Sequence, residues 1–251
     1  MEAYVKTEVT GSIARIEFYH PAHNSLPSTN LRELKLAIEE AGKDDSVNLI
    51  LLQSGGSRTF CAGASFTELV ALEAFEPAKS FFLGFANVIN AIRTCGKIVI
   101  GRVQGKAVGG GVGVASACDY CFATKFASTR LSELAVGIGP FVIGPAVERK
   151  IGLSAFSQMS LSPNVWRSAE WCREKGLFTE VFDSTEEMDQ YIVKFLDELN
   201  NMNPMAIAEL KSVFWQGTEH WNELLDKRAA MSGELVLSTY AKEAIQGFLN
   251  K

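Results

Sequence analysis

The carboxyl group of Glu133 stands among apolar neighbours in the segment 131–137, Leu-Ser-Glu-Leu-Ala-Val-Gly. Most of the 29 acidic residues of the chain must be solvated at its surface, whereas a carboxyl group in this setting is partly desolvated. Desolvation favours the neutral acid and raises the pKa, which makes the group a better proton shuttle near neutral pH. A buried glutamate with a structural role would produce the same pattern, so the segment alone is compatible with both roles.

A run of three glycines at 109–111 precedes an apolar segment at 112–118 that predicts a helix. It is not a dinucleotide fingerprint, because that motif needs a glycine where Val114 stands, and the segment 101–106 is one residue short of a P-loop. Bare N–H groups at the start of such a helix can face an anion. Glycines that serve only close packing between a strand and a helix would look the same.

A second loop of small residues, at 60–65, also lies between a predicted strand and a predicted helix. Two such loops could present two backbone N–H groups to one oxygen atom. This arrangement forms an oxyanion hole, which stabilises negative charge that develops in a transition state. The pair of loops therefore predicts a candidate site for chemistry at a carbonyl group.

The sequence gives little support for a metal site, a serine nucleophile or a disulfide framework. Cys118 and Cys121 form a single C-x-x-C without a second pair, so core thiols are the better interpretation and no metal site is expected. The chain has no G-x-S-x-G nucleophile motif. Its five cysteines lack the spacing of a disulfide framework, and residues 1–9 lack a secretory signal, which indicates a reducing compartment and a cytoplasmic location.

Composition excludes several classes of protein. The chain has 251 residues, of which 47% are hydrophobic and 21% charged, as in an ordinary globular protein. A net charge of −5 argues against a nucleic-acid partner, because binding to the phosphate backbone depends on clustered cations. The least polar stretch, 98–117, contains Arg102, Lys106 and several glycines, so no membrane-spanning segment is expected.

The hydrophobic pattern predicts an α/β fold that would position these loops. Alternating apolar residues or unbroken apolar runs predict strands at 14–18, 47–52, 98–103 and 120–124. Helical spacing predicts helices at 28–41, 66–72, 81–92, 112–118, 189–200, 204–214 and 234–248. Ser28 or Thr29 is expected to cap the first helix. No linker separates the strand-rich first part from the helix-rich last part, which indicates one core with a helical extension.

Taken together, several segments resemble motifs of the enoyl-CoA hydratase/isomerase (crotonase) superfamily, and are most similar to bacterial members of the methylglutaconyl-CoA hydratase type. The two segments 60–68 and 103–111 are similar to the family's two oxyanion-forming segments, and they occur in the expected order. Further similar segments are 21–26, 118–119, 132–138, 175–178 and 241–249. The resemblance therefore spans nearly the whole chain.

The resemblance implies a spiral of repeated ββα units over residues 1–195 and a helical trimerisation region over residues 196–251. It implies a homotrimer or a dimer of trimers. It also implies an acyl-CoA thioester substrate, with no cofactor other than the coenzyme A of the substrate itself. The thioester oxygen would accept hydrogen bonds from the N–H groups of Ala64 and Gly110, and Glu133 would transfer the proton.

The same resemblance assigns further residues to the substrate, with Phe248 near the adenine of coenzyme A and Lys251 near a phosphate. The full set of expected substrate-binding residues is Ala22, Ala62, Ala64, Ser65, Phe66, Gly109, Gly110, Gly113, Phe248 and Lys251.

One departure from the family pattern affects the expected reaction. Many hydratases of this family carry two catalytic glutamates, and Gly113 stands where the first would be, so Glu133 remains alone. Ser65 replaces the family's aspartate, and residues 138–141 differ from the usual I-P-G-x. Hydration of a 2-enoyl-CoA to a 3-hydroxyacyl-CoA is the expected activity. The alternatives are a Δ3-Δ2-enoyl-CoA isomerase and a non-catalytic CoA-thioester binder.

Overall fold

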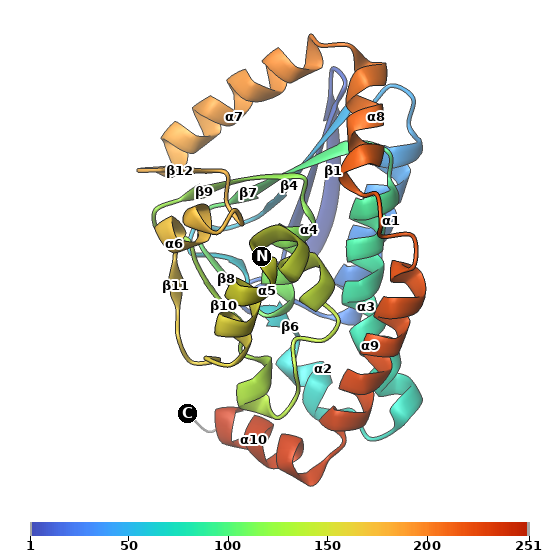
Figure 1. Ribbon diagram of the computed structural model, residues 1–251, viewed down its shortest axis with the longest axis vertical. Helices are drawn as coiled ribbons and strands as arrows, with labels where there is room; N and C mark the ends of the chain where they lie inside the picture. Colours follow the sequence, from blue (N-terminus) through green and yellow to red (C-terminus); the bar gives the residue numbers. More distant parts are fainter. Residues whose placement is uncertain (1, 250–251) are drawn as a thin grey trace.

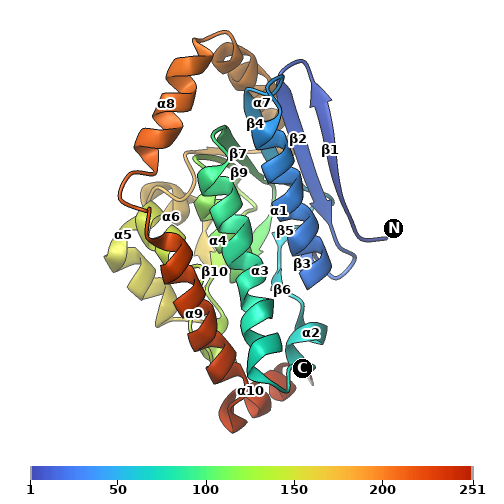
Figure 2. The same cartoon turned by 90° about the vertical axis from the view of Figure 1, so that its right-hand side faces the viewer.

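The computed structural model describes residues 2–249, except for the side chains of Phe248 and Leu249. A six-stranded sheet with the order β1-β2-β4-β7-β9-β12 forms its centre (Figures 1 and 2). β1 is antiparallel to β2, and all the other neighbours are parallel. These strands are β1 (Tyr4–Thr10), β2 (Ile13–Tyr19), β4 (Leu49–Ser54), β7 (Ile98–Val103), β9 (Tyr120–Thr124) and β12 (Glu180–Phe182).

A smaller sheet with the order β11-β10-β8-β5 lies beside the large one, and β3 pairs with β6. These short strands are β3 (Ser25–Leu26), β5 (Thr59–Cys61), β6 (Gly63–Ala64), β8 (Lys106–Val108), β10 (Ser128–Arg130) and β11 (Arg167–Ser168). The helices are α1 (Ser28–Lys43), α2 (Phe66–Val70), α3 (Phe75–Thr94), α4 (Gly110–Ala117), the 3₁₀ turn η1 (Glu133–Val136), α5 (Gly144–Ser160), α6 (Ala169–Glu174), α7 (Thr185–Asn200), α8 (Pro204–Phe214), α9 (Trp221–Val236) and α10 (Thr239–Leu249).

The elements repeat as strand, strand, helix, which confirms the expected crotonase-like spiral of ββα units. In three successive units the first strand (β4, β7 or β9) joins the large sheet and the second (β5, β8 or β10) joins the small one. A helix then returns the chain to the next unit. Because the second strands lie side by side, the loops that follow them meet at one end of the small sheet.

Helices cover both faces of the large sheet, which explains why β4 is apolar at successive positions. Ile50 and Leu52 of β4 belong to the core that includes α1 and α3. Leu49 and Leu51 point the other way, toward apolar residues of α7 such as Ile192. Successive side chains of a strand point to opposite faces, so a strand between two helical layers must be apolar throughout.

The first helix begins at Ser28 as expected, but its expected cap and the single helix expected over 234–248 are wrong. The residue before α1 is Pro27, and neither Ser28 nor Thr29 caps the helix. Instead, the carboxylate of Glu68, distant in sequence, accepts hydrogen bonds from the backbone N–H (2.9 Å) and hydroxyl (2.6 Å) of Ser28. The single helix expected over 234–248 is two helices, α9 and α10.

The other expected strands and helices are present with ends shifted by a few residues, apart from the helix expected over 81–92, which extends to Phe75–Thr94. The expected division at residue 195 falls inside α7 and remains a prediction. Cys118 and Cys121 are buried free thiols, as expected, and burial raises the pKa of Cys121 to about 12. No described helix is both long enough and apolar enough to cross a membrane.

Candidate active site

The loops that follow β5, β8 and β10 surround one pocket. They contribute the backbone of Ala62, Gly63 and Ala64, that of Val108, Gly109 and Gly110, and the side chains of Ser132 and Glu133. The rest of the wall is almost entirely apolar. It consists of Phe66, Leu69, Phe82, Phe85, Val136, Ile138, Gly139, Pro140, Phe141, Val142, Ile143 and Ser232.

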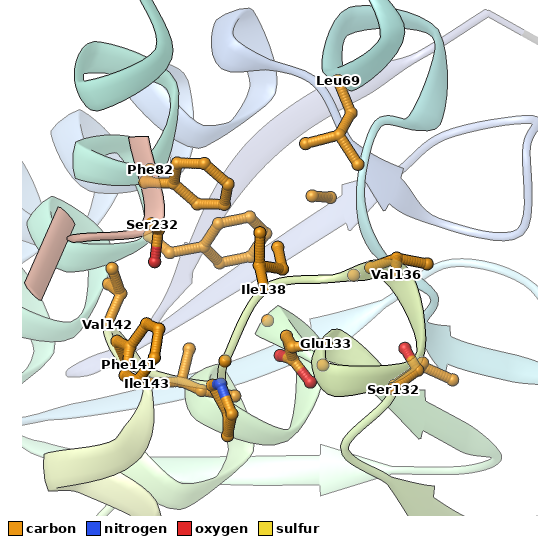
Figure 3. Close-up of a pocket in the computed structure, with 18 of the residues that line it drawn as sticks. Leu69, Phe82, Ser132, Glu133, Val136, Ile138, Phe141, Val142, Ile143 and Ser232 are labelled. Atoms are coloured by element: carbon orange, nitrogen blue, oxygen red, sulfur yellow. The ribbon is translucent and has the colours of Figure 1, made fainter. Parts of the chain in front are cut away.

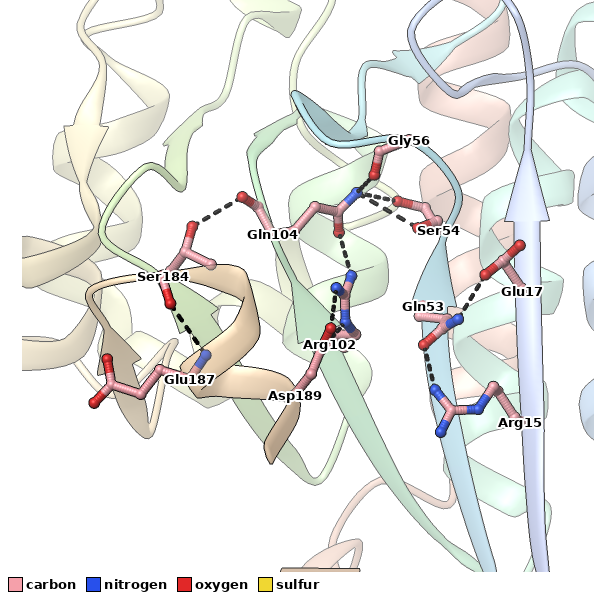
Figure 4. Close-up of polar contacts among 11 residues, drawn as sticks. Arg15, Glu17, Gln53, Ser54, Gly56, Arg102, Gln104, Ser184, Glu187 and Asp189 are labelled. Carbon is pink, nitrogen blue, oxygen red and sulfur yellow. Dashed lines mark hydrogen bonds and ion pairs between the residues drawn. The ribbon is translucent and has the colours of Figure 1, made fainter. Parts of the chain in front are cut away.

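The first loop is held by hydrogen bonds from outside it. The side-chain amide of Asn24 donates to the carbonyl oxygens of Gly55 (2.8 Å) and Thr59 (2.9 Å). The amide of Gln104 also donates to the Thr59 carbonyl (3.2 Å), and Gln104 receives a hydrogen bond from Arg102 (Figure 4). The carbonyl oxygen of Thr59 therefore accepts two side-chain hydrogen bonds, which fix the start of the segment that leads to the pocket.

The first and second loops touch through glycine. Gly63 has φ +89°, a conformation that side chains rarely adopt, and a Cβ on it would lie 2.8 Å from the carbonyl oxygen of Val108. The same Cβ would lie 3.5 Å from the backbone nitrogen of Gly110. Only glycine fits between the two loops at this position.

The second loop is shaped by close contacts on both sides. Gly109 has φ +50°, and its backbone N–H donates to the carbonyl oxygen of Arg130 (2.9 Å). Gly110 is the first residue of α4, where a backbone N–H has no acceptor within the helix. A Cβ on Gly110 would overlap the ring of Phe85, so this position also requires glycine.

Glu133 opens η1, immediately after the strand-to-turn loop of β10. Its Oε2 atom is buried and has no hydrogen-bond partner among the described residues. Burial raises the pKa of this carboxyl group to about 7, although a hydrogen bond from its own backbone N–H and the positive charge of Arg130 act in the opposite direction. The group can therefore both accept and donate a proton near neutral pH.

The apolar wall distinguishes this pocket from the rest of the surface. Figure 3 shows Leu69, Phe82 and Ile138 above Glu133 in this view, and all four residues line the pocket. Such a wall excludes water and holds a small apolar group near the carboxyl.

Within the described residues, no group of three His, Cys, Asp or Glu side chains could hold a metal ion.

The structure brings together six of the residues expected to touch the substrate, because all six line the pocket: Ala62, Ala64, Phe66, Gly109, Gly110 and Glu133. Three others do not line it. Ala22 is exposed on a separate loop, and the hydroxyl of Ser65 accepts a hydrogen bond from the Glu68 backbone N–H (3.4 Å). Gly113 packs against Ile143. The side chain of Phe248, and Lys251, lie outside the described residues.

Most of the pocket wall could not be found from the sequence. The helical spacing of Phe81 and Phe85 indicated a buried face, but it could not show that one end of that face borders a cavity. Ile143 and Ser232 carried no signal at all, because only the tertiary packing of the chain brings their side chains to the wall of the pocket.

A second cavity adjoins the first and shares Ala62 and Val108 with it. Its remaining lining includes the cations Arg58 and Lys106 and the ring of Trp166, together with His23 and Thr59. The ammonium of Lys106 lies 5.0 Å from the centre of the Trp166 ring. The guanidinium of Arg130 lies 4.7 Å from the same centre.

A ββα spiral whose oxyanion-type loops converge on one buried carboxyl group defines an enzyme of the crotonase fold. The family model for enoyl-CoA hydratase/isomerase matches residues 8–251, and the chain belongs to this family. It is therefore an enzyme that processes acyl-CoA thioesters by hydration or isomerisation.

Known relatives and solved structures agree with this family. The chain is 27% identical to the short-chain-enoyl-CoA hydratase of Clostridium acetobutylicum, over 97% of this chain and 94% of that protein. It is 30% identical to the mitochondrial methylglutaconyl-CoA hydratase of Mus musculus, over 78% of this chain but only 63% of that protein. The crystal structure of an enoyl-CoA hydratase from Bacillus halodurans superposes with a TM-score of 0.90, at 22% identity, covering 97% of this chain and 99% of that one.

Proposed function

We propose that this enzyme hydrates a 2-enoyl-CoA to a 3-hydroxyacyl-CoA. One observation carries the proposal: Glu133 lines the same pocket as Ala64 and Gly110. One of its carboxyl oxygens has no partner among the described residues, and its pKa is about 7. The similarity to the Clostridium acetobutylicum hydratase over almost the whole chain supports hydration.

The thioester oxygen would accept hydrogen bonds from the backbone N–H groups of Ala64 and Gly110. Negative charge grows on this oxygen when the β carbon is attacked, so donors fixed in advance stabilise the transition state more than the substrate. The N-terminal end of α4 adds a positive partial charge at the same place.

The ionised Glu133 would take a proton from water while the water oxygen forms a bond to the β carbon. The electron pair of the carbon–carbon double bond moves toward the thioester, giving an enolate. Glu133 then returns its proton to the α carbon, which restores the carboxylate and completes the addition of water. One carboxyl group suffices for both transfers because its pKa lies close to neutral pH.

The adjoining cationic cavity is a suitable place for the coenzyme A moiety. Arg58 and Lys106 offer positive charge for its phosphates, and Trp166 offers a flat face for adenine. The shared residues Ala62 and Val108 would then guide the thioester into the reaction pocket.

A homotrimer or a dimer of trimers and a cytoplasmic location belong to the same proposal. The exposed apolar side chains of Met205, Leu210, Val213 and Phe214 on α8 support association with another copy of the chain.

Isomerisation of a 3-enoyl-CoA is a second candidate, favoured by a separate observation. A Cβ on Gly113 would overlap the side chain of Ile143, so this position cannot hold the second glutamate of other hydratases. Isomerisation needs only one carboxyl group, which removes a proton at one carbon and returns it at another.

One experiment separates these activities. The protein is incubated in ¹⁸O-labelled water with a 2-enoyl-CoA and, separately, with a 3-enoyl-CoA. A labelled 3-hydroxyacyl-CoA from the first substrate is expected for the hydratase. If no label is incorporated and the 3-enoyl-CoA gains conjugated-thioester absorbance, the enzyme is an isomerase. If neither substrate changes, the chain is a non-catalytic binder.

A further inference from the structure

The charge of the pocket wall limits which acyl groups the pocket can accept. Among the described residues that line it, Glu133 is the only one with an ionisable side chain. Lys79 lies on the segment of α3 against which Gly233 packs, but its ammonium group pairs with Asp226 (2.9 Å) and it does not line the pocket. An acyl group that ends in a carboxylate would therefore lose water without gaining a counter-charge.

One hydroxyl group interrupts the otherwise apolar wall contributed by the helices. Ser232 lies on α9, is only 1% exposed and lines the pocket. Figure 3 shows its oxygen next to Phe82 and Val142, away from the carboxyl of Glu133. The position is set by the close packing of α9 on α3, because a Cβ on the neighbouring Gly233 would lie 2.9 Å from the backbone nitrogen of Lys79.

The Ser232 hydroxyl has no hydrogen-bond partner among the described residues, although a carbonyl group of the preceding helical turn could accept a hydrogen bond from it. Helical serine and threonine hydroxyls often donate to a carbonyl in the preceding turn. Thr94 does so with Asn90 (2.8 Å), and Ser160 with Phe156 (2.8 Å). No such bond forms at Ser232, so its hydrogen-bonding capacity remains for a molecule in the pocket.

We infer that the part of the pocket lined by Ser232 binds the acyl group of the substrate. It selects an uncharged acyl group that carries a hydrogen-bonding oxygen, such as a keto or hydroxyl oxygen, and rejects one that ends in a carboxylate. Ser232 is the specificity-determining residue. The inference rests on the proposed function only in that the ligand is a CoA thioester. It separates this enzyme from its methylglutaconyl-CoA hydratase relatives, whose named substrate carries a carboxylate.

The test uses saturated CoA thioesters, which bind but cannot be hydrated. The acyl chains tested have four, five or six carbons. At each length, calorimetry compares the affinities of three thioesters: the alkanoyl-CoA, the keto-acyl-CoA with its oxygen on the penultimate carbon, and the dicarboxylic mono-CoA thioester. At the length that binds most tightly, we expect the keto thioester to bind about 3–10-fold more tightly than the alkanoyl thioester. The dicarboxylic thioester is expected to bind at least about 10-fold more weakly.

Ser232→Ala is expected to abolish the keto preference while leaving the rejection of the carboxylate. Ser116→Ala is the matched control, because Ser116 is a buried, unpartnered helical hydroxyl that does not line the pocket. It should retain the wild-type ratios. A keto preference that persists in Ser232→Ala, or a dicarboxylic thioester that binds as well as the alkanoyl one, would overturn the inference.

The inference and the proposed function fail in different ways. If the thioesters bind in the expected order but the corresponding 2-enoyl-CoA is not hydrated, the proposed reaction is wrong and the selectivity stands. If hydration occurs and the expected order is absent, only the selectivity is wrong. If no CoA thioester binds, both are overturned.

Discussion

Gly109 leaves no room for a side chain beside the carboxyl group of Glu133 in the active-site pocket. A Cβ on Gly109 would lie 2.8 Å from Oε1 of Glu133, closer than real Cβ contacts come. The oxyanion-type loop and the acid/base group are therefore packed against each other. Any side chain on the glycine would displace the carboxyl group that is proposed to move the proton.

Replacing Gly109 with alanine should consequently lower kcat by about 10-fold or more, because misplacing a catalytic group by a fraction of an ångström weakens catalysis. Steady-state rates with a 2-enoyl-CoA measure the effect. Gly96→Ala is the matched control, since Gly96 also has a positive φ (+75°) but a Cβ on it would meet no atom within 4 Å. Equal losses in both variants would mean that backbone strain, not contact with Glu133, is responsible.

Replacing Glu133 with glutamine keeps the shape of the side chain and removes its titrating proton. We expect kcat to fall by about 10²–10⁴-fold, the usual contribution of a general acid–base group. Circular dichroism should show an unchanged fold. Glu170→Gln, at an exposed position on α6, should retain full activity. A fast Glu133→Gln enzyme would remove Glu133 from the mechanism.

The pH dependence of activity should report the same group. Hydration begins with the ionised carboxylate, and burial raises the pKa of Glu133 to about 7. The value of kcat/KM for the wild-type enzyme should therefore rise with pH and level off above an apparent pKa near 7. A flat profile between pH 5 and 8 would contradict this assignment.

The raised pKa also predicts how stability changes with pH. The neutral acid is favoured in the folded protein, so its stabilising effect is complete below the unfolded pKa of 4.5 and is lost as pH rises through about 7. Relative to Glu133→Gln, the wild-type free energy of unfolding should fall by up to about 3 kcal/mol between pH 4.5 and 8. Urea denaturation at both pH values measures this difference, and parallel changes in the two proteins would refute it.

Gly110 tests the proposed oxyanion donor from another direction. A valine at this position would overlap the Phe85 ring and obstruct access to the backbone N–H. Loss of one donor typically costs about 10²–10³-fold in rate. A folded Gly110→Val enzyme with normal kinetics would count against this pocket as the oxyanion site.

A buried ion pair attaches the C-terminal helices to the core. The ammonium of Lys211 on α8 lies 2.7 Å from Asp119, and both side chains are 2% exposed. Lys211→Met should lower the free energy of unfolding by about 3–5 kcal/mol, because the buried carboxylate of Asp119 keeps its hydrogen bonds from Val99 and Trp215 but loses its only counter-charge among the described residues. Lys227→Met, which removes an exposed pair with Glu223, should cost about 1 kcal/mol or less. Similar losses in both variants, measured by urea denaturation, would contradict this role.

The sequence by itself determined the features that depend on near neighbours. Alternation at residues 14–18 and the apolar runs at 47–52 and 98–103 predicted strands that the structure confirms, because the two-residue period fixes which face a side chain occupies. The apolar neighbours of Glu133 correctly indicated a desolvated carboxyl group. The order of strands, small-residue loops and helices predicted that two loops could act together.

The tertiary structure alone decided how distant segments meet. Glu68 rather than an adjacent residue caps the first helix, and Ile143 occupies the space beside Gly113. Ser232 reaches the pocket only because α9 packs along α3. Such contacts depend on strand register and on helix packing between segments far apart in the chain. Local periodicity carries information about which side of an element is buried, but none about which other element covers it.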